Sequence, residues 1–135
     1  MQSAIVSGRL VCCAGIIVDN LNEGDTPADA CPNFFCPGVE GALVQIIERD
    51  TVDPDDLLAN FRSLPNGFFS GIGQEDEMFD VDIDLVVTHQ CGAKPGCVRK
   101  TTVKVPLQMI NSCAAFTIDP FDLFHPGYET TEECS

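Results

Sequence analysis

The sequence predicts a single all-β domain, and three observations support this fold class. Short apolar runs bounded by glycine, proline and asparagine recur along the chain, which is typical of strands joined by turns. No stretch of about 12 residues keeps the 3.6-residue apolar period of an amphipathic helix. The length of 135 residues suits one hydrophobic core and is short for two ordinary domains. The expected strands are residues 4–13, 41–49, 67–71, 81–91, 97–106 and 114–118.

The segments between these strands are rich in turn and loop residues. Pro65-Asn66-Gly67 precedes two phenylalanines and predicts a tight turn that enters a strand. For the aspartate-rich segment 53–59 we expect one helical turn or a loop. Residues 20–38, rich in Asn, Asp, Gly and Pro, predict a loop insertion, and the tail 119–135 is expected to be irregular. One domain is therefore expected to span residues 1–135.

One hairpin can be predicted in register. In residues 80–91 charged side chains occupy even positions and apolar ones mostly odd positions, and residues 97–105 continue with polar even positions. If Cys91 and Cys97 face each other across the turn, antiparallel pairing places residues whose numbers sum to about 188 opposite one another. The predicted pairs are Lys104 with Asp84, Lys100 with Thr88, and His89 with Arg99 on the inner side.

The eight cysteines predict a disulfide-braced, secreted protein. Their even count and high frequency are typical of an oxidising, extracellular environment. Eight cysteines allow about 105 pairings, among which the sequence does not choose. The local pairs Cys31–Cys36 and Cys91–Cys97 are reasonable, which leaves Cys12 and Cys13 to reach Cys113 and Cys134. These spacings fit a zinc site poorly, and we expect no metal and no cofactor.

Charge is unevenly distributed along the chain. The net charge of −14 repels phosphates and argues against a nucleic-acid partner. The stretch between Asp84 and Asp119 nevertheless carries four basic and no acidic residues. These are Lys94, Arg99, Lys100 and Lys104. They are our candidate ligands for an anionic phospholipid headgroup. The alternative is structural: the lysines pair with Asp82 and Asp84 across the hairpin, and Arg99 supports His89.

Two further clusters have alternative interpretations. Phe34 and Phe35 lie between two cysteines and two prolines, where they form a membrane or receptor contact if exposed, or cap the core if turned inward. The acidic groups at residues 53–56 and 75–77 could offer carboxylate oxygens to calcium. Neither matches an EF-hand loop, so a solvated surface is the preferred interpretation.

An ordered set of segments resembles the nematode transthyretin-like family. The segments are residues 6–12 (VSGRLVC), 41–48 (GALVQIIE), 53–59 (DPDDLLA), 66–71 (NGFFSG), 89–91 (HQC) and 97–100 (CVRK). The resemblance covers about residues 4–106 and implies a secreted, transthyretin-like sandwich of two antiparallel sheets. The chain departs from the family pattern in the enlarged segment 20–38 and in the cysteine-bearing end after Cys113. Most family members have no established activity, but one binds phosphatidylserine and bridges dying cells to an engulfment receptor.

These observations lead to a functional hypothesis. The sister enzymes of transthyretin that hydrolyse 5-hydroxyisourate have a histidine early in the first strand and a Tyr-Arg-Gly-Ser ending, and this chain has neither. We expect a secreted binding protein without enzymatic activity. It would recognise phosphatidylserine on apoptotic cells and bridge them to a phagocyte receptor. The alternatives are a carrier of small apolar ligands, by analogy with transthyretin, and an effector that binds only a protein partner. The oligomeric state, the receptor and any calcium requirement stay open.

Overall fold

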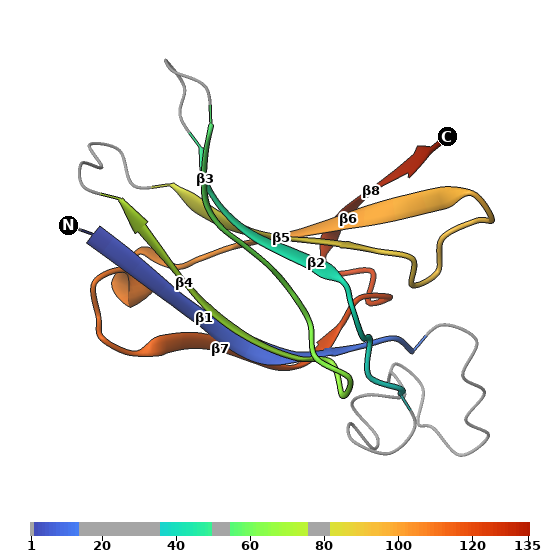
Figure 1. Cartoon of the computed structure of the whole chain (residues 1–135), viewed down its shortest axis with the longest axis horizontal. Helices are drawn as coiled ribbons and strands as arrows, with labels where there is room; N and C mark the ends of the chain where they lie inside the picture. The colour runs from blue at the N-terminus through green and yellow to red at the C-terminus, as the bar shows by residue number, and fades with distance from the viewer. Residues whose placement is uncertain (1, 14–35, 50–54, 76–81) are drawn as a thin grey trace.

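The computed structural model describes residues 2–13, 36–49, 55–75 and 82–135 (Figure 1). In this part of the chain two β-sheets pack face to face, and the predicted all-β sandwich is confirmed. The strands are β1 (Gln2–Val11), β2 (Leu43–Glu48), β3 (Asp56–Arg62), β4 (Phe68–Glu75), β5 (Ile83–His89), β6 (Cys97–Lys104), β7 (Ala115–Asp122) and β8 (Glu129–Cys134). One sheet has three strands in the order β4-β1-β7, and the other has five in the order β3-β2-β5-β6-β8. The expectation of two antiparallel sheets is wrong for the smaller one, in which β7 pairs with β1 in parallel because the chain crosses from β6 to this sheet near the start of β1. One 3-10 turn, η1 (Leu107–Met109), precedes β7.

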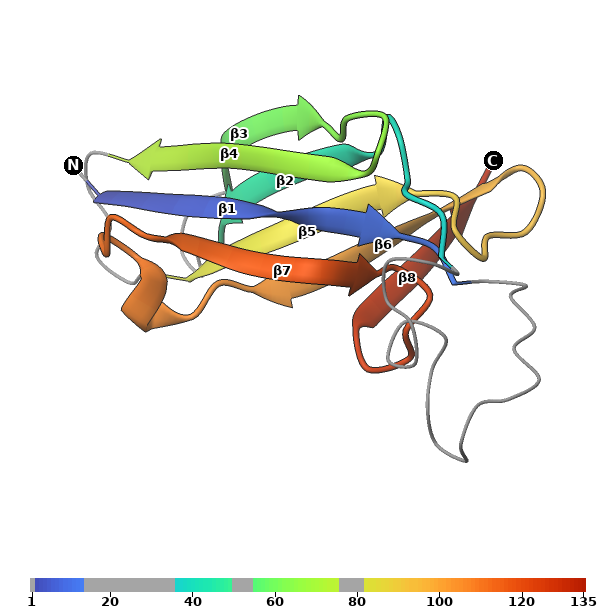
Figure 2. The same ribbon diagram turned by 90° about the horizontal axis from the view of Figure 1, so that it is seen from below.

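The core lies between the inner faces of the two sheets. Alternate residues of β1, β2 and β5 point inward and are fully buried, as the period of two in their sequences requires. Figure 2 shows β1 between β4 and β7, in front of the larger sheet. The shared core includes Val6 and Leu10 from β1, Val44 and Ile46 from β2, Leu85 and Val87 from β5, and Phe121 from β7.

The predicted hairpin register is confirmed. β5 pairs with β6 so that Asp84 lies opposite Lys104, Thr88 opposite Lys100, and His89 opposite Arg99. The alternation of charged and apolar residues favours this register, because a slip by one residue would turn Ile83, Leu85 and Val87 toward water. The Pro65-Asn66-Gly67 turn is also confirmed, since the Gly67 N–H donates to the Leu64 carbonyl at 2.8 Å.

Two segments expected to be irregular are strands. β3 includes residues 56–59 of the aspartate-rich segment, because it pairs with β2 and turns Ala59 and Phe61 toward the core. A bulge at Ile46/Ile47 interrupts the apolar alternation, which hides the strand in the sequence. The tail 119–135 extends β7 to Asp122 and then forms β8 beside β6. An edge strand of exposed polar residues has no apolar period to detect.

The disulfide pairing differs from the expected one. The described cysteines form Cys12–Cys91, Cys13–Cys36 and Cys97–Cys134. The local pairs Cys31–Cys36 and Cys91–Cys97 are therefore wrong, as is the expectation for Cys12 and Cys13. Their partners are decided by which strand ends meet in space, and not by proximity in the chain. Cys113 is a free, exposed thiol and not a disulfide cysteine. Cys31 lies outside the described residues.

Gly71 of β4 allows the two sheets to approach closely. A Cβ atom at this position would lie 2.2 Å from Cε1 of Phe61 on β3, well inside van der Waals contact. We therefore expect Gly71→Ala to lower the free energy of unfolding by about 2 kcal/mol, the usual cost of overpacking a core. Urea unfolding measures this change. Ser70→Ala, one residue away with an exposed side chain, is the matched control and is expected to change stability little. Equal effects of the two substitutions would contradict the prediction.

Candidate functional site

A cleft of about 460 Å³ opens at one end of the larger sheet, where β2 begins, β5 ends and β6 begins. Residues of the 39–43 segment form one wall, and residues of β5 and β6 form the other. Apolar residues and one glycine make up more than half of its lining, and the polar or charged side chains are Glu40, Arg62, Thr88, His89 and Gln90. Its outer lining includes Glu40, Leu43, Arg62, Thr88, Gln90 and Val98, with His89 and Cys91 at its base. We refer to it as the Arg62 cleft.

Backbone hydrogen bonds hold the first wall of the Arg62 cleft. Gly41 adopts a positive φ of 74°, which turns the chain into β2. Its N–H donates to the Ser63 carbonyl, and the Ser63 N–H donates to the Ala42 carbonyl, both at 3.0 Å. The Arg62 guanidinium donates through NH1 to the Gly41 carbonyl at 3.0 Å. The exposed Arg62 side chain is thus attached to the wall that it lines.

A directional hydrogen-bond chain runs from the base of the cleft. The Cys91 N–H donates to Nδ1 of His89 at 3.0 Å, so the neutral ring carries its proton on Nε2. Nε2 then donates to the Thr101 hydroxyl at 2.8 Å. The Thr130 hydroxyl donates to the Tyr128 carbonyl at 3.4 Å, so in the bond of 3.0 Å between the two hydroxyls Thr101 is the donor. Burial, and to a smaller extent the positive charge of Arg99, together lower the pKa of His89 from 6.5 to about 4. His89 is therefore neutral at pH 7 and joins β5, β6 and β8.

Two disulfides brace the same end of the sandwich. Cys12–Cys91 connects the end of β1 in the smaller sheet to the turn after β5 in the larger one. Cys13–Cys36 connects the chain after β1 to the segment that leads into the cleft wall. These covalent links reduce the freedom of the cleft end relative to loops held by hydrogen bonds alone.

The four predicted headgroup ligands do not form one cluster. Lys104 lies at the far end of β6, where it forms ion pairs with Asp82 and Asp84, as the structural alternative expected. Arg99 faces inward opposite His89 and donates to the Cys91 carbonyl at 3.4 Å. Lys94 lies in the exposed turn between β5 and β6. Lys100 does not line the cleft, but it lies opposite the lining residue Thr88 and therefore next to the cleft.

An acidic strand lies beside this basic one. In β8, Glu132 lies opposite Arg99 of β6, and Glu133 lies opposite Val98. The Glu133 carboxylate lies 3.7 Å from the Lys100 ammonium. Both partners of this ion pair are exposed, so its contribution to stability is small. The sequence places these charges about 30 residues apart, and only the pairing of β6 with β8 brings them together. The positive charge near the cleft is therefore partly balanced.

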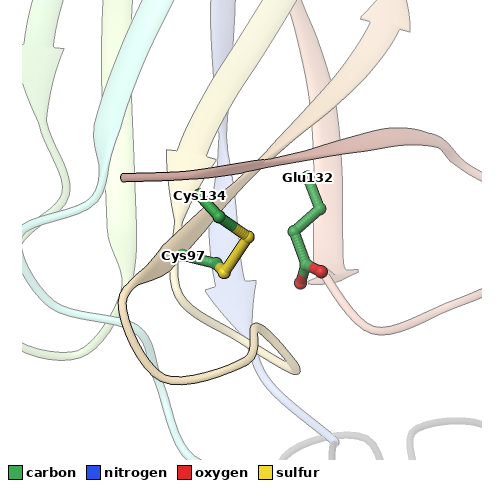
Figure 3. A group of neighbouring side chains, drawn as sticks. All are labelled: Cys97, Glu132 and Cys134. Atoms are coloured by element: carbon green, nitrogen blue, oxygen red, sulfur yellow. A yellow bond between two sulfur atoms is a disulfide. The ribbon is translucent and has the colours of Figure 1, made fainter.

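A group of three candidate metal ligands in the described residues is not a metal centre. The ligand atoms of Cys97, Glu132 and Cys134 lie within 4.8 Å of one another. Figure 3 shows, however, that the two sulfurs are joined, with an S–S distance of 2.06 Å. Cysteine binds zinc as a free thiolate, so a disulfide removes both sulfur ligands and leaves one carboxylate.

Some candidate residues lie outside the described part of the chain. These are Phe34, Phe35, Asp53, Asp76 and Glu77, so the predicted membrane contact and half of the six acidic residues are not placed. Asp55 is placed: it accepts a hydrogen bond from Arg49 at 3.0 Å, and Arg49 also binds Asp84 at 2.9 Å. Both hydrogen bonds raise the pKa of Arg49, and the bond to Asp84 has the larger effect.

The sequence analysis missed Arg62 and Glu40 as binding candidates. Arg62 ends β3, whose first residues were expected to form a helical turn or a loop, and Glu40 precedes a strand without any motif around it. A signal was present for Arg62, because it ends the apolar run before the predicted turn at Pro65. Recognising that run as a strand would have placed Arg62 beside Leu43 at the sheet end.

Comparisons with known proteins agree with the two-sheet architecture. Residues 33–106 match the Transthyretin-like family (TTR-52). The chain is 40% identical over 125 residues to Transthyretin-like protein 16 of Caenorhabditis elegans, which covers 91% of this chain and 92% of that protein. It is 42% identical over 74 residues to Transthyretin-like protein 5 of the same nematode, covering 53% of this chain and 52% of the relative. No solved structure matches the chain. The match and the sandwich together show that this chain belongs to the transthyretin-like family.

Proposed function

We propose that this chain is an extracellular binding protein that recognises phosphatidylserine on apoptotic cells and bridges them to a phagocyte receptor. The observation that carries the proposal is the Arg62 cleft, in which opposite charges surround a space of about 460 Å³. The phosphatidylserine headgroup itself carries a phosphate, a carboxylate and an ammonium group. A cleft lined by Arg62 and Glu40, with Lys100 at its border, is complementary to that set of charges.

Each side chain has a role in this proposal. Arg62 presents a planar guanidinium that can bind phosphate or carboxylate oxygens in a bidentate way. Lys100 adds a second positive charge beside Thr88, whose hydroxyl can donate to an anionic oxygen. Glu40 accepts hydrogen bonds from the headgroup ammonium. The neutral His89 below adds no charge, so the cations at the rim determine the attraction.

The remaining surface is assigned to the receptor. Residues 85–118 carry a charge of +4, whereas the whole chain carries −14. The rest of the chain therefore carries −18. An acidic surface is not attracted to an anionic membrane but can bind a basic protein. Three disulfides in the described residues support an oxidising, extracellular location. In the described part of the chain, no helix is long and apolar enough to cross a membrane.

Co-sedimentation with vesicles tests the proposal. The oxidised protein is mixed with phosphatidylcholine vesicles that contain or lack phosphatidylserine, with calcium and with chelator. We expect selective pelleting with phosphatidylserine, and we expect Arg62→Glu with Lys100→Glu to weaken it by at least about tenfold, as loss of charge-assisted hydrogen bonds does. Lys104→Glu is the control, because Lys104 lies at the other end of β6 and is paired with Asp82.

The other outcomes discriminate among mechanisms. Loss of pelleting in chelator would transfer the role from the basic cleft to a calcium site. A double variant that binds as well as the native protein would contradict the cleft assignment. No pelleting in any condition would contradict phosphatidylserine recognition itself and favour an effector that binds a protein.

A further inference from the structure

We infer that the turn between β3 and β4 is a membrane-inserting tip, with Leu64 and Phe68 entering the interfacial region of a phosphatidylserine bilayer. The inference rests on the proposed function and adds to it an apolar anchor and an orientation. The sequence analysis placed such an anchor at Phe34 and Phe35, which lie outside the described residues. The structure provides a different apolar pair, at a defined position next to the Arg62 cleft.

The two side chains are exposed at a tight turn. The side chain of Leu64 is 59% exposed and that of Phe68 is 47% exposed, although both are large and apolar. The Leu64 N–H donates to the Phe68 carbonyl at 2.8 Å, so the two residues face each other across the turn. Exposed apolar side chains in close pairs cost free energy in water, and they are typical of surfaces that bind lipid or protein.

The turn is rigid and therefore loses little conformational entropy on binding. Gly67 has a φ of 86° and no room for a side chain, since a Cβ atom would lie 2.2 Å from the Leu10 carbonyl oxygen. That carbonyl accepts the Val39 N–H at 2.9 Å, and the Leu10 N–H donates to the Gly67 carbonyl at 2.8 Å. Because the turn is already ordered, little of the free energy gained by moving its apolar side chains from water into lipid is offset by the cost of ordering it, and more of that gain appears as binding affinity.

The turn adjoins the headgroup cleft. Ser63 precedes Leu64 and is hydrogen-bonded to Gly41 and Ala42, both of which line the Arg62 cleft. Arg62 itself is two residues from Leu64. Figure 2 shows the β3–β4 turn and the chain entering β2 at the same end of the sandwich. Insertion of Leu64 and Phe68 would therefore bring Arg62 to the level of the phosphates.

Charge at the two ends of the sandwich favours this orientation. The end that holds the turn and the cleft carries basic and acidic residues in nearly equal number, namely Arg62, Lys94, Arg99 and Lys100 with Glu40, Glu132 and Glu133. At the opposite end, where β3 and β5 begin and β2 ends, the carboxylates of Asp55, Asp56, Asp82, Asp84 and Glu48 outnumber the described cations Arg49 and Lys104. An anionic membrane repels the second end more strongly than the first, so the protein would dock with β3 and β4 roughly upright on the surface.

The absence of tryptophan from the sequence permits a direct test. Leu64→Trp and Phe68→Trp each place one fluorophore at the turn. Leu57→Trp and Ile72→Trp are matched controls, because Leu57 is 53% exposed at the start of β3 and Ile72 is 48% exposed in the middle of β4. With phosphatidylserine vesicles we expect the emission of the two turn probes to shift to shorter wavelength and to be quenched by brominated acyl chains. The control probes should keep their emission.

A second set of variants measures the contribution of the tip to affinity. Leu64→Ser with Phe68→Ser should weaken vesicle binding by about tenfold or more, given the apolar area withdrawn from water. Leu57→Ser with Ile72→Ser removes the same residue classes away from the turn and should change binding less than about twofold. Unfolding curves of all variants identify any that fail to fold. If a serine variant fails to fold, the fluorescence of the tryptophan variants tests the inference in its place.

The results separate this inference from the proposed function. If the native protein pellets with phosphatidylserine but the turn probes keep the emission they show in water, the tip assignment is wrong and headgroup recognition stands. If control and turn probes shift equally, the protein lies flat on the bilayer and the orientation is wrong. If the native protein does not pellet with any vesicles, both the proposed function and the tip assignment are wrong. A turn-probe shift that appears with a protein partner but not with vesicles would overturn the lipid assignment.

Discussion

Replacing both Cys12 and Cys91 by alanine is expected to lower the free energy of unfolding by about 4 kcal/mol, the largest effect we predict. The disulfide joins residues separated by 79 positions, against 23 and 37 for the other two described disulfides. In the chain-entropy account the stabilisation grows with the length of the closed loop. Cys12–Cys91 also links the two sheets at the cleft end, so its loss should loosen the site as well as the fold.

Urea unfolding of the oxidised proteins measures this effect. Cys113→Ala is the matched control, because Cys113 is exposed and unpaired in the described structure and should change stability little. The double variant Cys97→Ala with Cys134→Ala should lose less than the Cys12 and Cys91 variant, since it opens a shorter loop at a sheet edge. A loss of less than about 1 kcal/mol for Cys12 and Cys91, the size of an ordinary substitution, would contradict the prediction.

Acidification is expected to destabilise the protein through His89. The pKa of this histidine falls from 6.5 in the unfolded chain to about 4 in the fold, mainly because the ring is only 5% exposed. Below pH 6.5 the unfolded chain therefore takes up a proton that the folded chain does not. The stabilisation is complete above pH 6.5 and is lost as the pH falls toward 4. Its total is about 3 kcal/mol.

Two measurements check this expectation. The chain has two histidines, so proton NMR can follow each ring, and His89 should start to titrate only near pH 4 while the native fold persists. Urea unfolding at several pH values should show a steeper decline for the native protein than for His89→Gln, with His125→Gln as the control. The difference isolates His89 from the many carboxylates that titrate in the same range. A His89 ring that titrates near 6.5 in the folded protein would show that the buried hydrogen-bond chain does not hold it neutral.

Much of the fold could be predicted from local pattern. The β5–β6 register followed from the alternation in both strands together with the placement of Cys91 opposite Cys97 across the turn, since a shift by one residue would bury Lys100 and Lys104. The turn at Gly67 followed from residues that favour tight turns. β3 escaped prediction because a bulge against β2 interrupts its alternation, and β8 escaped because its residues are mostly polar and exposed.

The candidate site was predicted less well than the fold. Of the four basic residues singled out, Lys100 borders the cleft, whereas Lys104 is paired with Asp82 at the far end of the strand and Arg99 faces inward. Arg99, Lys100 and Lys104 lie along one strand, in which each residue advances the chain by about 3.3 Å and successive side chains point to opposite faces. Residues that are close in sequence are therefore not gathered at one site. Arg62 reaches the cleft from another strand.

What the sequence by itself determined were the all-β class, the central hairpin register and the family. Each depends on properties that neighbouring residues express together, namely alternation, turn chemistry and an ordered set of motifs. The disulfide partners, the strand character of the acidic tail and the position of Arg62 beside Glu40 were decided only by the tertiary structure. They depend on contacts between segments far apart in the chain, and such contacts arise only when the two sheets pack and bury a common core.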